Sequence, residues 1–83
     1  MQPHEEGLTL LQVSKRLGFQ PKRILSYEYN GHYEPPFRRK GKRMVRFYPP
    51  SLVGLLEKAV VLIQRGYGPK LAFYMAKRDE VAS

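Results

Sequence analysis

The sequence predicts a mainly α-helical domain with one small β-hairpin. Hydrophobic residues recur at helical spacing in four segments, and glycine and proline residues separate these segments. Between the second and third segments, a basic stretch rich in strand-forming residues surrounds Gly41. A chain of 83 residues has room for one domain with one modest core, so a deep enclosed active site is not expected.

The first helix is predicted over residues 10–17. Thr9 precedes it, and the threonine hydroxyl can accept a hydrogen bond from an unpaired amide of the first turn. Val13 and Leu17 lie on one face at helical spacing. Gly18 follows, where a helix commonly ends in a left-handed residue.

The second helix is predicted over residues 21–30. Pro21 suits its first position, because the amide hydrogen that proline lacks has no partner there. Ile24 should face inward. Two helices that are separated only by the short turn at Gly18-Phe19 must cross steeply, as in helix-turn-helix motifs.

A two-stranded hairpin is predicted from residues 37–40 and 42–48, with Gly41 in its turn. Pro35-Pro36 imposes an extended path before it, and Pro49-Pro50 ends it. A helical hairpin followed by such a basic wing predicts a winged helix-turn-helix with two further helices.

These two further helices are predicted at about residues 52–65, where Ser51 is the expected cap, and about residues 70–78, which follow Pro69. The predicted organisation is a flexible leader at 1–7, the winged helix-turn-helix domain at 8–78 and a fraying tail at 79–83.

The charge is strongly positive and localised. Fifteen basic and seven acidic residues give a net charge of +8, which favours a polyanionic partner such as nucleic acid. Eight of the basic residues lie between Pro21 and Arg46, against only Glu28 and Glu34. A charge run is most often a solvated face, so charge alone leaves a solvated surface and a binding patch about equally favoured. The predicted helical hairpin and wing favour the binding patch.

The segment 8–19, followed by Tyr27-Glu28-Tyr29-Asn30-Gly31, resembles the DNA-binding domain of the MerR family of transcription regulators. The Gly66-Tyr67 turn also matches that family, and the resemblance covers about residues 8–77. It implies a winged helix-turn-helix that binds double-stranded DNA.

The sequence departs from this family at two places. Family members usually carry Arg-Tyr-Tyr-Glu where this chain has Leu25-Ser26-Tyr27-Glu28, and Arg23 is the candidate to replace the missing arginine. The residue that matches the family tyrosine at the end of the wing is either Phe47 or Tyr48. We also expect this protein to lack the long dimerisation helix and the effector domain of the sensing members, as the short phage excisionases do.

Two sets of residues are predicted to contact DNA. The outer face of the second helix would approach base edges and flanking phosphates, and the wing would lie along the backbone or in the minor groove. Tyr27 could donate its hydroxyl to a phosphate, but its spacing from Ile24 suits the core at least as well. The predicted DNA-binding residues are Lys22, Arg23, Ser26, Tyr27, Tyr29, Arg38, Arg39, Lys40, Lys42, Arg43 and Arg46.

The helix predicted at 52–65 is apolar most of the way round, which is typical of a helix buried on more than one side. Val53 and Val60 lie beside its core face, and Val61 lies among polar residues. Either the fourth helix covers these additional apolar side chains, or the three valines form an interface with a second copy or another protein.

The sequence offers little for catalysis, cofactors or membranes. It lacks cysteine, and His4 and His32 form no metal-ligand pattern, so we expect no metal, no cofactor and no enzymatic activity. No export signal or membrane-spanning run is apparent. We therefore expect a cytoplasmic, nucleoid-associated protein.

Three functions remain open at this stage. The first is a sequence-specific transcription regulator that binds double-stranded DNA. The second is an architectural or recombination factor of the excisionase kind, and the third is a basic protein-interaction module that does not bind DNA.

Overall fold

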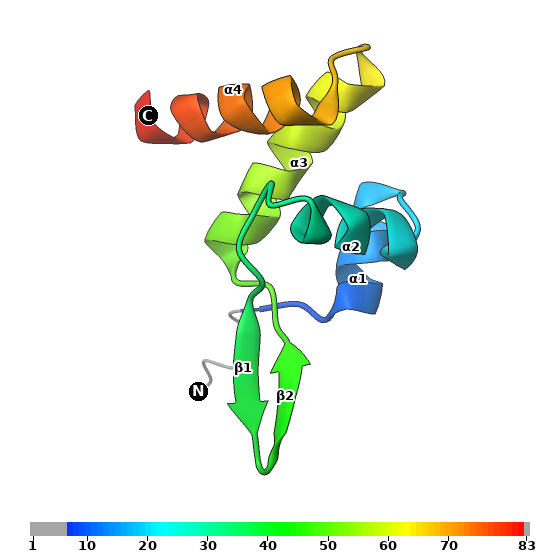
Figure 1. Cartoon of the computed structure of the whole chain (residues 1–83), viewed down its shortest axis with the longest axis vertical. Helices are drawn as coiled ribbons and strands as arrows, with labels where there is room; N and C mark the ends of the chain where they lie inside the picture. The colour runs from blue at the N-terminus through cyan, green and yellow to red at the C-terminus, as the bar shows by residue number, and fades with distance from the viewer. Residues whose placement is uncertain (1–6, 83) are drawn as a thin grey trace.

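The structure is a computed structural model that describes residues 7–82, with side chains described for residues 7–78. The predicted leader, except for Gly7, lies outside the described residues, as does Ser83. The described part is mainly helical with one antiparallel hairpin, which confirms the predicted fold class (Figure 1). Its elements are α1 (Leu10–Leu17), α2 (Pro21–Tyr29), β1 (Phe37–Lys40), β2 (Arg43–Arg46), α3 (Pro50–Gln64) and α4 (Pro69–Ala82).

Helix α1 begins and ends as the sequence predicts. The Gln12 amide donates to the Thr9 hydroxyl over 3.2 Å, and the Thr9 amide donates to the Gln12 side-chain oxygen over 2.9 Å. At the other end, Gly18 has φ 75°. The buried Ser14 hydroxyl donates to the Phe19 carbonyl, so a side chain of α1 stabilises the turn that leads into α2. This turn sets the crossing of the two helices.

The wing is a hairpin in which Lys40 pairs with Arg43 across the two-residue turn Gly41-Lys42. Gly41 has φ 66°, a left-handed value that glycine adopts without steric cost. The second strand ends at Arg46, so its predicted extension to Tyr48 is wrong. Tyr48 pairs instead with Leu8, because each backbone amide donates to the carbonyl of the other, over 2.8 and 2.7 Å.

Helices α3 and α4 depart from prediction at their ends. Pro50 takes the first helical position of α3 and Pro49 is the cap, without a side-chain hydrogen bond. The predicted Ser51 cap is therefore wrong, because the fixed φ of Pro50 already suits the start of a helix. The backbone of α4 is helical to Ala82, so residues 79–82 continue the helix rather than forming a frayed tail.

The core joins the four helices and the segments that enter and leave the wing. Its largest fully buried side chains are Val13 of α1, Ile24 of α2, Leu56 of α3 and Tyr48, which follows the wing. Helix α4 adds Phe73, whose ring stacks on Tyr33 at a centroid distance of 6.2 Å and contacts Tyr27 edge-on at 5.6 Å. Ile24 and Leu17 are both buried, as predicted for the crossing of α1 and α2.

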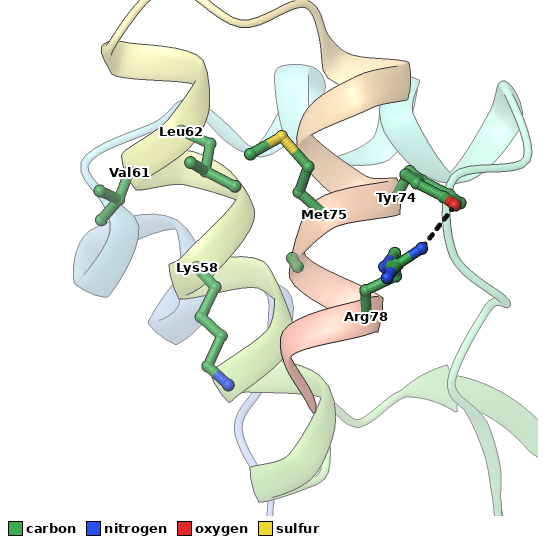
Figure 2. A pocket seen from close by; sticks show the side chains of 7 residues that line it. Lys58, Val61, Leu62, Tyr74, Met75 and Arg78 are labelled. Carbon is green, nitrogen blue, oxygen red and sulfur yellow. Dashed lines mark hydrogen bonds between the residues drawn. The ribbon is translucent and has the colours of Figure 1, made fainter. Parts of the chain in front are cut away.

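Two of the three predicted interface valines belong to this core. Val53 and Val60 are each only 6% exposed, so assigning them to a protein interface is wrong. Val53 lies beside Leu8 and Tyr48, and α3 packs against α4 more extensively than any other two elements pack. Val61 differs, because it is 45% exposed on the outer side of α3 (Figure 2).

Candidate nucleic-acid interface

The wing presents five exposed basic side chains. Residues 37–46 contain no acidic residue, so nothing in the hairpin itself offsets this charge. The wing projects away from the helices, at the opposite end of the molecule from α4 (Figure 1). A positively charged ribbon of this shape can follow a nucleic-acid backbone, where it neutralises phosphates and releases counterions. The five residues are Arg38, Arg39, Lys40, Lys42 and Arg43.

Helix α2 presents a second polar surface. Lys22, Arg23 and Tyr29 are exposed, and Tyr29 is among the most exposed large side chains of the described residues. Ser26 is half-buried, and its hydroxyl donates to the Arg23 carbonyl over 2.6 Å. Because that hydroxyl hydrogen is used within the helix, Ser26 can offer a ligand only its acceptor lone pairs.

Arg23 is held in place by two aromatic side chains. Its Nε donates to the Tyr27 hydroxyl over 2.9 Å, and its guanidinium lies 4.1 Å from the centroid of the Phe19 ring. These contacts leave the two terminal amino groups of Arg23 for a ligand. A guanidinium fixed in this way loses less side-chain entropy on binding. Of the residues predicted on α2 to contact DNA, Arg23 is therefore the one whose side chain the structure holds most firmly.

Tyr27 occupies the core rather than the surface. Its side chain is 5% exposed and its ring packs against Phe73, so the structure favours the core interpretation over the phosphate contact. The Tyr27 hydroxyl accepts a hydrogen bond from Arg23. Tyr27 therefore has an indirect role, because it orients the arginine side chain.

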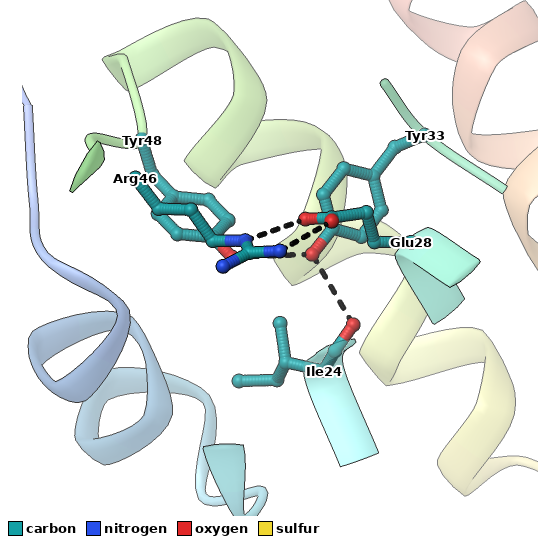
Figure 3. A network of polar contacts seen from close by, with 5 residues as sticks. All are labelled: Ile24, Glu28, Tyr33, Arg46 and Tyr48. Carbon is teal, nitrogen blue, oxygen red and sulfur yellow. Dashed lines mark hydrogen bonds and ion pairs between the residues drawn. The ribbon is translucent and has the colours of Figure 1, made fainter. Parts of the chain in front are cut away.

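Arg46 also requires a correction, because it is committed to an ion pair within the protein. Its Nε donates to Glu28 Oε1 over 3.0 Å and its Nη2 donates to Glu28 Oε2 over 2.8 Å (Figure 3). The Glu28 side chain is only 5% exposed and that of Arg46 24%. This hydrogen bonding raises the pKa of Arg46. We therefore assign Arg46 to the joint between the wing and α2 and remove it from the predicted phosphate contacts.

Two buried tyrosines extend this joint. The Tyr33 hydroxyl donates to the Ile24 carbonyl over 3.2 Å and lies 3.2 Å from the Tyr48 hydroxyl, with which it shares a hydrogen bond (Figure 3). Burial raises the pKa of both hydroxyl groups. Of the two aromatic residues that follow the wing, Tyr48 is the one that enters this network. The network fixes the exit of the wing against α2.

Sequence reasoning missed Glu28 and Tyr33 as functional supports. One signal was available, because Glu28 follows the core residue Ile24 by four positions and thus shares its inward face. A carboxylate on an inward face requires a partner, and the nearby wing is rich in arginine. No comparable pattern marks Tyr33, whose position depends on the path of the loop after α2.

Among the described side chains, no group of three or more histidine, aspartate or glutamate residues is arranged to hold a metal ion. None of the helices in this part of the chain combines the length and hydrophobicity that crossing a bilayer requires. Comparison with known proteins found no family model and no curated protein that matches the sequence.

Proposed function

We propose that this chain binds double-stranded DNA with sequence preference, as a small transcription regulator of the MerR-like type. One observation carries the proposal. The Arg46–Glu28 ion pair ties an exposed basic wing to α2, the helix that presents Lys22 and Arg23. Two anion-binding elements are thus held at a fixed relative position, as rigid recognition of a duplex requires.

The two elements contribute in different ways. The wing neutralises phosphates and provides affinity that depends on salt but little on sequence. Helix α2 enters the major groove, where the terminal amino groups of Arg23 can pair with the edge of a guanine. Lys22 contacts flanking phosphates. The proposal needs no cofactor and no catalytic step, and it places the protein on the nucleoid.

The proposal is tested by selecting DNA from a randomised duplex library at about 200 mM salt, where non-specific binding is weak. We expect one enriched motif, followed by protection of that motif in footprinting. A single palindromic site supports a regulator, whereas an array of direct repeats supports the architectural role. If no motif is enriched over random duplex, both the regulator and the architectural role are contradicted. The remaining function is then a protein-interaction module that does not bind DNA.

A matched pair of charge reversals localises the surface. Lys42→Glu in the wing should weaken binding to the selected duplex strongly, whereas Lys70→Glu on α4 should have little effect. Both side chains are exposed and both changes alter the net charge equally. Equal weakening by the two variants would show a response to overall charge and would contradict binding through the wing.

A further inference from the structure

Arg38 and Phe47 lie on the same face of the wing. In the hairpin register Arg38 pairs with Val45, and Phe47 follows Val45 by two positions, so the two side chains are diagonal neighbours across the strands. The Phe47 amide donates to the Pro36 carbonyl over 2.9 Å, which continues the pairing just past the end of β2. At this diagonal spacing an aromatic ring and a long side chain can meet.

The Arg38 guanidinium lies over the Phe47 ring. Its central carbon is 4.8 Å from the ring centroid, close enough for a cation–π interaction. Such a contact forms no hydrogen bond, so the N–H groups of the guanidinium can still donate to another group. Among the described residues, the Arg38 side chain forms no hydrogen bond and no ion pair. The ring therefore restrains this cation while its donors remain available.

The Phe47 ring is itself held by its neighbours. It is half-buried, and the next residue, Tyr48, is fully buried in the core. Gly7 lies so close to the ring that a side chain at this position would overlap Phe47. Leu8, which follows Gly7, pairs with Tyr48 through two backbone hydrogen bonds and so fixes this segment beside the ring. The ring is therefore a firm support for Arg38.

Arg39 lacks such a support, although it is also an exposed arginine of β1. It pairs with Met44 and lies on the opposite face of the hairpin, since successive side chains of a strand alternate. Among the described residues, the Arg39 side chain has no ring contact, hydrogen bond or ion pair. Arg39 must therefore lose more side-chain freedom than Arg38 when it binds an anion.

Arg38 is accessible to a nucleic-acid backbone. Its side chain is exposed, and with Phe47 it lines an open hollow at the base of the wing, which Pro36 and Pro49 also line. Phosphate oxygens accept strong, charge-assisted hydrogen bonds from a guanidinium. A phosphate that reaches this hollow would meet an arginine that is already held in place.

We propose that Phe47 is a positioning residue for Arg38, and that the two residues form a preorganised phosphate contact at the base of the wing. This inference rests on the proposed function, since it concerns how the wing meets duplex DNA. Because the ring restrains the guanidinium before binding, a phosphate is bound with less loss of side-chain entropy. Among the exposed cations of the wing, Arg38 is the one for which the described residues provide such a support.

The test measures the affinity of the chain for a selected duplex by fluorescence anisotropy over a series of salt concentrations. Phe47→Leu removes the ring, whereas Phe47→Tyr keeps it. Phe47→Leu is made in the parent, in Arg38→Ala and in Arg39→Ala. Arg39→Ala is the matched control, because it removes the same charge from the neighbouring residue on the other face of the hairpin.

Arg38→Ala should weaken binding and lower the salt slope by about one. Phe47→Leu should weaken binding about two- to fivefold, the factor that an exposed cation–π contact corresponds to, with an unchanged salt slope because no charge is lost. It should have no further effect in Arg38→Ala, but it should weaken Arg39→Ala by the full factor. Phe47→Tyr should bind like the parent.

A second pair of variants leaves Phe47 in place and so does not depend on how well Phe47→Leu folds. Arg38→Lys keeps the charge but replaces the planar guanidinium, so it should weaken binding about two- to fivefold. Arg39→Lys makes the same change where there is no ring, and binding should change by less than about twofold.

Three results would overturn the inference. If Phe47→Leu weakens binding equally in the parent and in Arg38→Ala, the ring supports the wing as a whole and does not act through Arg38. If Arg38→Ala leaves both the affinity and the salt slope unchanged, Arg38 is not a phosphate contact. If Arg38→Lys and Arg39→Lys weaken binding equally, the ring gives Arg38 no advantage. A parent chain that binds no duplex would contradict the proposed function itself, and this inference with it.

Discussion

The ion pair between Arg46 and Glu28 determines how the basic surface of the wing lies relative to α2, although neither residue is part of that exposed surface. A buried carboxylate is costly unless a cation and hydrogen bonds compensate it. Arg46 provides both, with two hydrogen bonds to Glu28, and its guanidinium also lies 4.8 Å from the centroid of the Phe37 ring. Because Arg46 is on β2 and Glu28 is on α2, this pair holds the wing against the helix.

Arg46→Ala should therefore lower the stability of the fold as its main effect. It leaves Glu28 buried without its partner, and we expect the free energy of unfolding to fall by roughly 2–4 kcal/mol. Urea denaturation measures this change. Arg43→Ala is the control, since Arg43 is exposed and its loss should change stability by less than about 0.5 kcal/mol. Similar stability of the two variants would show that the ion pair is not a structural joint.

The Tyr33–Tyr48 pair predicts a loss of stability at alkaline pH. Burial raises the pKa of both hydroxyl groups above the ordinary value of 10.0, so the folded state keeps its protons where the unfolded chain loses them. Their contribution to stability is thus fully present below pH 10 and falls as the pH rises further. Thermal melts between about pH 8 and pH 11 should show this decline, and Tyr33→Phe should make it shallower.

The control for this measurement is Tyr29→Phe, which removes a hydroxyl from an exposed tyrosine. It should leave the alkaline decline as steep as in the parent. Tyr33→Phe also removes the hydrogen bonds of this hydroxyl to Ile24 and Tyr48, at a cost of about 1 kcal/mol each at neutral pH. The quantity to compare is therefore the slope of melting temperature against pH. If Tyr33→Phe and Tyr29→Phe have the same slope, Tyr33 is not the cause of the alkaline loss of stability.

At the scale of elements, the crossing of α1 and α2 is the part of the fold that positions α2. Leu17→Ala should lower the free energy of unfolding by about 2–5 kcal/mol, because it leaves a cavity at this crossing. Ile24→Ala should cost as much, since Ile24 is among the most deeply buried residues. Leu11→Ala is the control on the same helix, because Leu11 is 59% exposed. A melting temperature of Leu17→Ala within a few degrees of the parent would contradict this packing.

The wing and α2 should contribute separately to binding. Arg43→Ala should weaken binding to all duplexes and lower the salt slope by about one, since one phosphate contact is lost. Arg23→Ala should instead relax the preference at one base position, at a cost of roughly 1–3 kcal/mol. Anisotropy titrations on selected and random duplexes measure both effects. If Arg23→Ala weakens binding to both duplexes equally, α2 is not the element that reads sequence.

At the scale of the whole molecule, local signals predicted the fold well. The Thr9 cap, the Gly18 turn and Pro21 each act within a few residues, and the structure has all three as predicted. The predictions were wrong where a residue far away in the sequence determines the local structure. The second strand of the hairpin ends at Arg46 because Tyr48 pairs with Leu8. These two residues are separated by 39 residues of sequence, so no local pattern predicts their pairing.

The residues of the candidate site divide in the same way, into those that local sequence predicts and those whose role depends on distant residues. The exposed basic residues of the wing were predictable, because a short basic hairpin has little core to enter. Arg46 looked the same in sequence, and only the position of Glu28 across the domain distinguishes it. Likewise, Val53, Val60 and Val61 share one helix and one residue type, yet tertiary packing buries the first two and exposes the third.

The central claim is that α2 and the wing together bind duplex DNA with sequence preference. The most direct measurement is the affinity of the parent chain for a selected duplex and for a shuffled duplex of equal length and composition, over a series of salt concentrations. We predict that affinity for both falls steeply with salt, and that the selected duplex binds at least about 10³-fold more tightly near physiological salt. Equal affinity for the two duplexes at every salt concentration, or no binding to either, would contradict the claim.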